Sequence, residues 1–342
     1  MRILFLMRLF YPHIGGVERH VVEVAKRLAK LGHEVSVVSE TPQSSIKYVK
    51  TYEIPVGRNE KLKKFQIWWW LWKNRNLIRQ ADIIHAHDVG FWYFPFRLLY
   101  PKKPFFITFH GYEQYPPKKR QILIRKISEK LARGNICVGD YIPKWYGTKA
   151  TYTIYGGVEI LPILQINTNT TNNKNILFIG RLDEQTGIMT YLELLKILKK
   201  KGISFKLLIC GDGPLKRKAD NFIRNNKLEA KILGFVANPE KYLAQTRFAF
   251  VSRYLSILEA MAAKKLVFAT FDNPIKEDYL KLSPFLKWII IEGSPEALYN
   301  KLVYYTQHPE EEKKKVEEAY NWARQQTWEK VIDLYLKLWR LR

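Results

Sequence analysis

The sequence predicts an α/β protein made of two doubly wound, parallel-sheet halves. Its 342 residues are enough for two domains, at roughly 150 residues per domain. Short apolar runs alternate with stretches of helical periodicity along almost the whole chain, as in successive βαβ units. The alternation pauses in a polar, Asn/Thr-rich stretch after Leu161 and then restarts, which indicates a linker. We therefore expect one domain over residues 1–162 and a second over residues 163–342.

The first half opens with a strand, a loop, a helix and a second strand. Ile3–Met7 is an apolar run typical of a buried parallel strand, and apolar residues at helical spacing follow over Val17–Leu31. Gly32 ends this helix, and Glu34–Ser39 forms the next strand. The remaining elements expected here are a helix at 61–80, strands at Asp82–His87 and Phe105–Phe109, a helix at 118–133, and strands at Asn135–Val138 and Thr151–Ile154.

The second half repeats the alternation. Its expected strands are Ile176–Gly180, Phe205–Cys210, Lys231–Leu233, Phe248–Ser252, Val267–Thr270 and Trp288–Ile291. Its expected helices are 187–201, 214–226, 238–245, Ser256–Ala263 and most of 294–340. Because parallel strands place ligands beyond their carboxyl ends, two such halves predict an interdomain cleft that holds the ligand.

Composition excludes several classes of protein. A hydrophobic fraction of 47% is ordinary for a globular chain and excludes disorder over most of its length. The two cysteines, Cys137 and Cys210, are too few for a disulfide framework or a cysteine-based zinc site. No apolar run is long enough to span a membrane, and Arg8 interrupts the first one too early for a signal peptide. We therefore expect a cytoplasmic location.

The positive charge of the chain is unevenly distributed. Lys and Arg number 57 against 32 Asp and Glu, a net charge of +25 that suits nucleic acid, an anionic membrane or phosphorylated ligands. Segment 58–79 alone holds seven basic residues and one acidic residue, and segment 102–133 holds nine and two. Nucleic acid is not an expected partner, because no known nucleic-acid-binding module occurs.

Segment 58–79 mixes basic with aromatic residues. One helical face collects Leu62, Phe65, Trp69 and Trp72, and we expect this face to pack on the sheet. Trp70 falls off that face, among lysines, and Trp with Lys and Arg suits a membrane interface. Two interpretations of the basic segments stay open: core helices with a solvated basic face, or peripheral contact with the inner face of a membrane.

Two loops in the second half carry candidate ligand-binding residues. Arg181 follows an apolar strand, where its planar guanidinium could hold a diphosphate, although a surface salt bridge would explain it equally well. Gly211 and Gly213 follow the next strand and allow either close approach of a ligand or simply a tight turn.

A third loop leads from the strand at Phe248–Ser252 through Arg253 into a helix. The first N–H groups of that helix offer a site for an anion. Glu259 lies about one turn inside an otherwise apolar stretch, where an unpaired carboxylate would be costly, and it could accept hydrogen bonds from ribose hydroxyls. An ordinary amphipathic helix is the alternative.

Further short motifs occur in the first half. They are Ile14-Gly-Gly-Val-Glu-Arg-His, Ile83-Ile-His-Ala-His-Asp, Ile107-Thr-Phe-His-Gly and Tyr155-Gly-Gly-Val-Glu. In their order and spacing, these motifs and the three loops resemble the GT-B glycosyltransferases, specifically glycosyltransferase family 4, over nearly the whole chain. The resemblance implies transfer of a sugar from a nucleotide diphosphate sugar to a glycan or lipid-linked acceptor, with retention at the anomeric carbon and without a cofactor.

The resemblance also implies roles for individual residues. Arg181 would bind the diphosphate, Glu259 would hold the ribose, and His110 would reach the transferred sugar or the reacting centre. His110 as a packed strand-end histidine is the alternative. The remaining donor-binding candidates are Gly15, Gly16, Gly211, Gly213, Arg253, Tyr254, Leu255 and Ser256. In the family, a terminal helix such as the one expected from Thr327 crosses back to the first domain; capping the second domain is the alternative.

Two positions depart from the family pattern. Thr186 stands where the family usually has a lysine that joins the arginine on the diphosphate, and Val251 stands where it usually has an acidic residue. Arg253 could supply the missing cation. The chain has no Asp-x-Asp pair, so no metal site is expected. A sugar-nucleotide epimerase of the same fold and a non-catalytic nucleotide- or lipid-binding relative stay open as alternatives.

Overall fold

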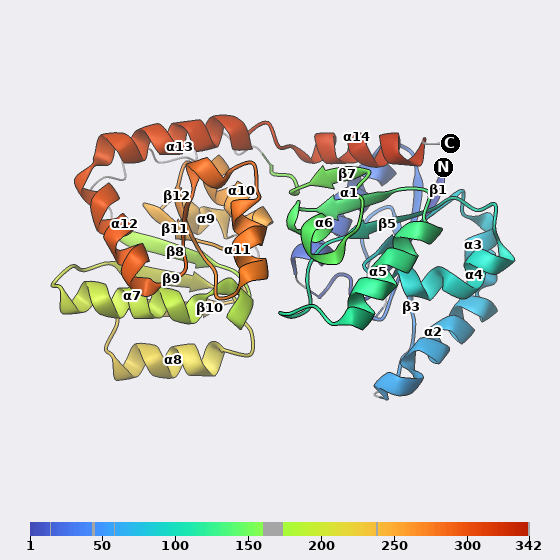
Figure 1. Cartoon of the computed structure of the whole chain (residues 1–342), viewed down its shortest axis with the longest axis horizontal. Helices are drawn as coiled ribbons and strands as arrows, with labels where there is room; N and C mark the ends of the chain where they lie inside the picture. The colour runs from blue at the N-terminus through green and yellow to red at the C-terminus, as the bar shows by residue number, and fades with distance from the viewer. Residues whose placement is uncertain (14, 43–44, 58, 160–173, 237–238, 341–342) are drawn as a thin grey trace. The chain divides into compact units, whose positions relative to one another are not determined.

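The computed structural model describes residues 1–340 apart from 14, 43–44, 58, 160–173 and 237–238. The chain divides into two compact units (Figure 1). Unit 1 comprises Met1–Tyr155 together with the end of the chain from Trp328, and unit 2 comprises Gly156–Thr327. The predicted linker and the boundary at 162/163 lie outside the described residues.

Unit 1 is built on a seven-stranded sheet whose described strands all pair in parallel. Its order is β3-β2-β1-β4-β5-β6-β7. The strands are β1 Arg2–Met7, β2 Glu34–Ser39, β3 Val49–Glu53, β4 Ile83–His87, β5 Phe105–Phe109, β6 Asn135–Val138 and β7 Tyr152–Ile154. The chain adds β2 and β3 on one side of β1 and then returns to add β4 on the other side. The order in which strands are added therefore reverses between β1 and β4, although the two strands are parallel.

The helices of unit 1 cover this sheet. They are α1 Gly16–Lys30, α2 Glu60–Lys73, α3 Arg75–Gln80, η1 Gly90–Tyr93, α4 Phe94–Leu99, α5 Lys119–Leu131, α6 Tyr141–Tyr146 and α14 Trp328–Trp339. The helix expected over 61–80 is two helices, because the chain breaks at Asn74. Sequence periodicity does not indicate α4 or α6, since six residues are too few to establish a helical repeat.

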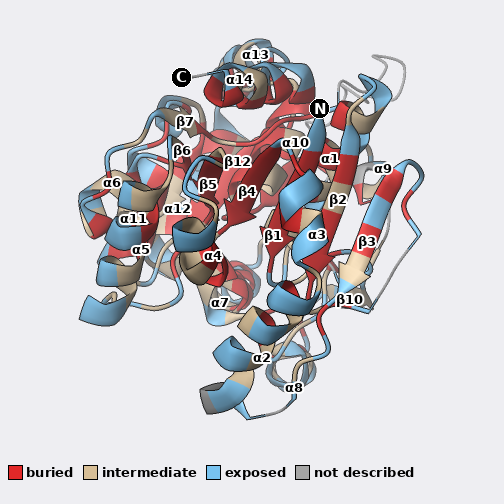
Figure 2. Cartoon of the chain, turned by 90° about the vertical axis from the view of Figure 1, so that its right-hand side faces the viewer, coloured by how far each residue is buried: buried red, intermediate tan, exposed pale blue. Residues whose placement is uncertain are grey.

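The expectation that Leu62, Phe65, Trp69 and Trp72 pack on the sheet is wrong. Their exposed fractions are 53%, 53%, 59% and 49%, whereas Ile67 on the same helix is 1% exposed. In Figure 2 most of α2 has the colours of exposed and intermediate residues, and the helix packs against η1. Apolar residues occur on both sides of this helix, so its sequence alone does not decide which side is buried.

Unit 2 contains a six-stranded parallel sheet of order β10-β9-β8-β11-β12-β13. Its strands are β8 Asn175–Ile179, β9 Lys206–Cys210, β10 Ala230–Gly234, β11 Phe248–Phe250, β12 Leu266–Thr270 and β13 Ile290–Glu292. Its helices are η3 Glu184–Thr186, α7 Ile188–Lys200, α8 Lys216–Asn225, α9 Glu240–Leu243, α10 Tyr254–Ala262, α11 Pro274–Lys281, η4 Leu286–Trp288, α12 Pro295–Gln307 and α13 Pro309–Ala323. Two parallel-sheet α/β units confirm the predicted fold class.

The terminal helix α14 packs in unit 1, against α1 and β7. The chain enters and leaves unit 2 side by side, because Val158 N–H donates a hydrogen bond of 2.8 Å to the carbonyl of Gln326. Of the two positions open for the terminal helix, the structure therefore has it on the first unit. Among the described residues, no helix is long and apolar enough to cross a membrane.

A buried ion pair fastens α13 to the sheet of unit 2. The Arg247 guanidinium, just before β11, lies 3.1 Å through Nε and 2.5 Å through Nη2 from Oε2 of Glu312 on α13. The two residues are only 4% and 7% exposed. Lys265 is buried nearby, and burial lowers the pKa of its ammonium to about 8 even though the Glu312 charge acts in the opposite direction.

Replacing one partner of this pair leaves the other charge buried. We expect Arg247→Met to lower the free energy of unfolding by about 3 kcal/mol, measured by urea denaturation. The matched control is Arg224→Met, which removes an exposed i,i+4 ion pair with Asp220 and should change stability by less than about 1 kcal/mol. Equal effects of the two substitutions would contradict a structural role for the buried pair.

Candidate functional site

In the sheet of unit 2, the order in which strands are added reverses between the parallel neighbours β8 and β11. These strands are neighbours, although β9 and β10 lie on the other side of β8. Ligands of open parallel sheets bind beyond the carboxyl ends of the strands at such a point. The loop after β8 carries Arg181 and the loop after β11 carries Arg253, so the structure brings these two predicted residues to the same edge. Arg253 Nη2 donates a hydrogen bond to Gln185 Oε1 and thereby links the two loops.

Arg181 presents a largely exposed guanidinium. Its side chain is 60% exposed, and its Nε lies 3.7 Å from Asp183 Oδ2. Thr186, at the position where the family usually has lysine, is instead 2% exposed. Its hydroxyl oxygen lies 2.7 Å from the Arg181 carbonyl and 2.9 Å from the Asp183 carbonyl, and its N–H donates to Asp183 Oδ1. Thr186 therefore closes the turn that carries Arg181.

Gly211 and Gly213 are required by the packing of the chain itself. A Cβ on Gly211 would lie 1.8 Å from the Gly180 carbonyl oxygen, and one on Gly213 would lie 2.5 Å from the Leu182 carbonyl oxygen. Gly213 also has φ = +158°, and Leu182 N–H donates a 2.9 Å hydrogen bond to the Asp212 carbonyl. The tight-turn interpretation explains both glycines, which support the Arg181 loop from beneath.

Helix α10 begins at Tyr254, earlier than the predicted Ser256. The N–H of Tyr254 donates a 2.8 Å hydrogen bond to Tyr279 Oη, and the two rings stack with centroids 3.9 Å apart. Tyr254, one of the predicted donor-binding residues, is thus a packed residue whose N–H already donates to Tyr279. Among the described residues, the N–H groups of Leu255 and Ser256 meet no acceptor, so they are the ones an anion could use.

Glu259 lies in the middle of α10 and is only partly exposed. Its neighbours Leu258 and Ala260 are fully buried. The carboxylate is therefore at the boundary between the core of unit 2 and its surface, on the helix whose first turn follows the Arg253 loop. This position suits a carboxylate that binds hydroxyl groups.

Sequence reasoning missed Lys276 on α11. It is fully buried, its Nζ donates to the Ser252 carbonyl, and the ammonium lies 4.0 Å from the centre of the Tyr279 ring. Burial lowers the pKa of Lys276 well below its ordinary value, and the Arg253 charge lowers it further, while Asp272 and Asp183 oppose the shift. An anion bound at this loop would favour the protonated form. No sequence signal indicates the residue, because a lysine in the first turns of a helix is ordinary.

In the sheet of unit 1, the order in which strands are added also reverses, between β1 and β4. Gly15 and Gly16 follow β1, Asp88 follows β4 and His110 follows β5, so the structure gathers these residues at one edge of the sheet. A Cβ added to Gly16 would meet nothing within 4 Å. The packing of unit 1 therefore does not require glycine there, and the space beside its backbone is open. At Gly15, a Cβ would meet Glu18 Oε2 at 2.2 Å, the movable end of a side chain.

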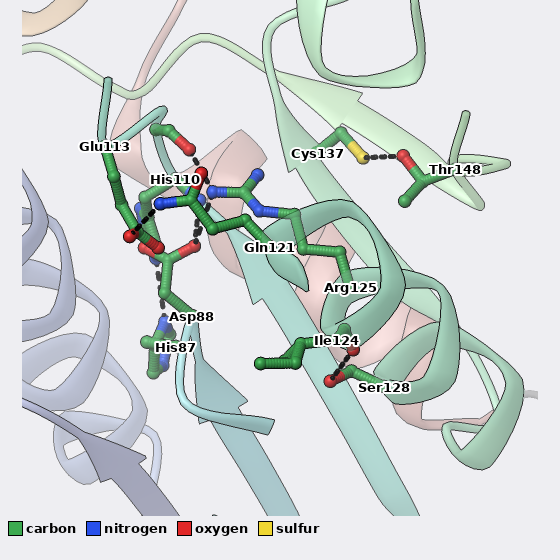
Figure 3. Close-up of polar contacts among 11 residues, drawn as sticks. His87, Asp88, His110, Glu113, Gln121, Ile124, Arg125, Ser128, Cys137 and Thr148 are labelled. Atoms are coloured by element: carbon green, nitrogen blue, oxygen red, sulfur yellow. Dashed lines mark hydrogen bonds and ion pairs between the residues drawn. The ribbon is translucent and has the colours of Figure 1, made fainter. Parts of the chain in front are cut away.

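His110 is held from both its backbone and its ring (Figure 3). Its N–H donates a 2.9 Å hydrogen bond to Asp88 Oδ1, and its Nε2 lies 2.9 Å from His87 Nδ1. Burial, assisted by the Arg125 charge, lowers the pKa of His110 to about 3. The ring is consequently neutral at physiological pH and can offer a lone pair or a neutral N–H. His87 Nε2 has no partner among the described residues.

Arg125 fixes the turn that follows His110. Although it belongs to the basic segment 102–133, it is only 7% exposed; it donates to the Gly111 carbonyl and its guanidinium lies 3.9 Å from the centre of the Tyr146 ring. It also lies 3.9 Å from Asp88 Oδ1. Burial raises the pKa of Asp88, while Arg125 opposes that shift. Arg125 is therefore a positioning residue and not part of a basic surface.

A buried hydrogen-bonded network ties α14 to the strands behind His110. Trp339 Nε1 donates to His85 Nδ1 over 3.0 Å, and because this indole can only donate, the neutral His85 carries its proton on Nε2. His85 Nε2 then donates to Thr108 Oγ1, 2.8 Å away. Thr108 Oγ1 lies 3.0 Å from Tyr335 Oη, which lies 3.0 Å from His20 Nε2. Sequence reasoning missed this network, since its members come from four elements far apart in the chain.

The described residues contain no group of three or more His, Cys, Asp and Glu side chains suited to a metal ion. Cys137 and Cys210 are buried and unpaired.

Comparison with known proteins gives matches in both halves of the chain. The model of "Glycosyltransferase Family 4" matches residues 14–160, and that of "Glycosyl transferases group 1" matches residues 162–322. An uncharacterised glycosyltransferase of Methanocaldococcus jannaschii is 27% identical over 92% of this chain and 87% of its own length. A GDP-mannose:cellobiosyl-diphosphopolyprenol alpha-mannosyltransferase of Xanthomonas oryzae is 24% identical over 62% of this chain and 60% of its own length.

Solved structures share the fold at low identity. A glycosyltransferase from Rickettsia africae superposes with a TM-score of 0.74 at 19% identity, covering 99% of this chain and 98% of the other. HepE from Anabaena, solved in complex with UDP and glucose, has a TM-score of 0.74 at 16% identity and covers 98% of both chains.

The buried histidines should make stability depend on pH. Burial lowers the pKa values of His20, His85, His87 and His110 below their ordinary value of 6.5. Above pH 6.5 neither the folded nor the unfolded chain is protonated at these sites. Below it only the unfolded chain takes up protons, so the free energy of unfolding falls by about 1.4 kcal/mol per pH unit for each histidine.

We expect the melting temperature to fall steadily from pH 7 to pH 5.5. His20→Gln keeps an acceptor for Tyr335 and removes one titrating ring, so it should make this fall less steep in a thermal scan. His308→Gln, which replaces an exposed histidine, is the control and should leave the steepness unchanged. If the melting temperature of His20→Gln falls with pH as steeply as that of the parent, protonation of the His20 ring does not destabilise the folded chain.

Proposed function

Because the chain belongs to the GT-B glycosyltransferases, with a family 4 first half and a group 1 second half, we propose that it is a retaining enzyme. Its donor is a nucleotide diphosphate sugar and its acceptor a glycan or a lipid-linked saccharide. The observation that carries this proposal is the pair of arginines, Arg181 and Arg253, at the β8/β11 edge of unit 2, where α10, the helix of Glu259, begins.

The chemistry of the donor explains why cations gather at that edge. Sugar transfer releases a nucleotide diphosphate, and its developing negative charge is stabilised by fixed donors and positive groups. Arg181 offers an exposed guanidinium, Arg253 a second one, and the N–H groups of Leu255 and Ser256 two further donors. Lys276 lies beneath the same loop, and a diphosphate bound there would favour its protonated form. In this proposal Arg253 and Lys276 together replace the lysine that Thr186 displaces.

Glu259 and the residues of unit 1 complete the assignment. The Glu259 carboxylate accepts hydrogen bonds from the two ribose hydroxyls of the donor. His110, being neutral, does not act as an acid near pH 7; its ring or its backbone carbonyl lies beside the sugar and stabilises the cation-like transition state. Gly15 and Gly16 let the backbone approach the donor, which the open space at Gly16 supports. No step of this scheme needs a metal ion.

The proposed acceptor class is supported by the relatives. The Xanthomonas enzyme is named for GDP-mannose and a cellobiosyl-diphosphopolyprenol, a lipid-linked saccharide. A lipid-linked acceptor requires the enzyme to work at a membrane surface, so we propose a cytoplasmic protein that contacts the inner face of an anionic membrane through segments 58–79 and 102–133.

The direct test is product analysis with a panel of nucleotide diphosphate sugars and polyprenyl-diphosphate-linked acceptors. The proposal predicts a glycosylated acceptor with the anomeric configuration of the donor, read by NMR. Epimerised nucleotide sugar without transfer would establish the epimerase alternative. Donor binding in a thermal-shift panel, with neither transfer nor hydrolysis, would establish a non-catalytic binding protein.

The role of the paired arginines is tested by single substitutions. Arg181→Ala and Arg253→Ala should each lower kcat/KM by about 100-fold, because each removes a charged donor to the leaving diphosphate. Arg224→Ala removes an exposed cation from α8 of the same unit and should stay within about twofold of the parent. Unchanged kinetics in Arg253→Ala would reject its assignment as the replacement cation.

Gly16→Ala separates a ligand contact from a structural need. The added Cβ enters open space, and alanine is the better helix former, so the free energy of unfolding should not fall. If the donor approaches this backbone, KM for the donor should rise by about tenfold or more, as a methyl group now occupies contact space. Parent-like kinetics in this variant would remove Gly16 from the donor site.

A further inference from the structure

An exposed aromatic face runs along α2. It consists of Leu62, Phe65, Trp69 and Trp72, each about half exposed, while the opposite side of the helix buries Ile67 and Leu71. Spacings of three, four and three residues put the four side chains on one side of the helix. Large apolar side chains gathered in this way on a surface indicate an interaction site.

A Lys or Arg side chain lies over each aromatic ring of this face. Lys64 Nζ lies 4.8 Å from the centre of the Phe65 ring, and Lys73 Nζ lies 3.7 Å from that of Trp69. The Arg75 guanidinium at the start of α3 lies 5.4 Å from the Trp72 ring. Rings that reach outward next to Lys and Arg match the composition of helices lying in a membrane interface, where rings enter the acyl boundary and cations meet phosphate.

The helices that share the contact with η1 also carry exposed apolar and basic residues. α2, α4 and α5 all pack against η1, and α4 also contacts α5. Exposed apolar residues occur on α4 at Leu98 and Leu99 and on α5 at Leu123 and Ile127, with exposed fractions from 39% to 83%. Exposed basic residues accompany them on α5: Lys119, Arg120, Lys126 and Lys130.

We propose that the exposed face of α2, flanked by α4 and α5, docks on a bilayer that contains anionic lipids. A protein partner fits less well, because protein interfaces are depleted of lysine, and here lysines lie directly on the exposed rings. The charge of the segment is complementary to an anionic surface, with seven basic residues and one acidic residue over 58–79. The face that docks is the one the sequence predicts to be buried, and Trp70 is not part of it.

This inference deepens the proposed function, since it supplies the surface from which a lipid-linked acceptor would be reached. It leaves the donor residues of unit 2 untouched, so docking and catalysis can be measured separately. The two can also fail separately: vesicle binding needs no turnover, and transfer to a short-chain, water-soluble acceptor needs no vesicle.

The experiment is co-sedimentation of the full chain with vesicles of phosphatidylcholine alone or with about 30% phosphatidylglycerol. The parent chain should bind the anionic vesicles and lose binding as salt rises. Trp69→Ser/Trp72→Ser should weaken vesicle binding by about tenfold or more, because it removes the two largest inserting rings. Lys64→Gln/Lys73→Gln/Arg75→Gln should weaken binding to anionic vesicles by a similar factor and leave weak neutral binding unchanged.

The matched control is Lys47→Gln/Tyr48→Asn. Tyr48 is 66% exposed with Lys47 Nζ 4.9 Å from its ring, but it lies off α2; asparagine tolerates its positive φ of 67°. This control should bind vesicles within about twofold of the parent, and all variants should keep the parent's transfer to a water-soluble acceptor and its melting temperature.

Three outcomes would overturn the proposal. The first is parent-like vesicle binding by the Trp69/Trp72 variant, and the second is equal loss of binding in the Lys47/Tyr48 control. The third is a parent chain that does not bind vesicles but self-associates in sedimentation velocity, with self-association abolished by Trp69→Ser/Trp72→Ser. That result would make the exposed face of α2 an interface between copies of this chain. If instead vesicle binding behaves as expected and no sugar is transferred to any acceptor, the docking surface stands and the proposed function fails.

Discussion

Unit 1 depends on the requirement that buried polar groups be hydrogen-bonded. Imidazoles on β4 and α1 are removed from water, and each unpartnered nitrogen would cost free energy. The terminal helix meets this requirement for His85 and His20, because Trp339 and Tyr335 complete the chain of hydrogen bonds from His85 through Thr108 to His20. The last helix of the sequence is consequently part of the first unit, and the strands behind His110 are fixed by residues more than 200 positions away.

The candidate donor site of unit 2 rests on close backbone packing. Gly211 and Gly213 allow the turn after β9 to lie against the Arg181 loop, and Thr186 closes that loop from within. On the other side, Lys276 and Tyr279 of α11 hold the segment from Ser252 to Tyr254. Residues that bind no ligand thus place the two arginines, which explains why glycines that look like ligand contacts in the sequence have a structural reason.

Much of the fold and part of the site follow from sequence pattern. Strands such as Glu34–Ser39, Phe105–Phe109 and Asn135–Val138 have the predicted bounds, because an apolar run between turn signals allows one interpretation. Arg181 and Arg253 could be found, since each follows a recognisable strand at a loop. Lys276, Arg125 and the histidine network could not, because a buried cation or imidazole is identified by its three-dimensional partners.

By itself, the sequence determined the alternation of strands and helices, the two α/β halves, and the order of motifs that marks the family, because periodicity and short motifs are local properties. Only the tertiary structure decided which side of α2 faces water, that Arg125 is buried although it lies in a basic segment, and that the helix from Trp328 belongs to unit 1. Each of these depends on which distant element covers a given side chain, and burial by a distant element leaves no local pattern.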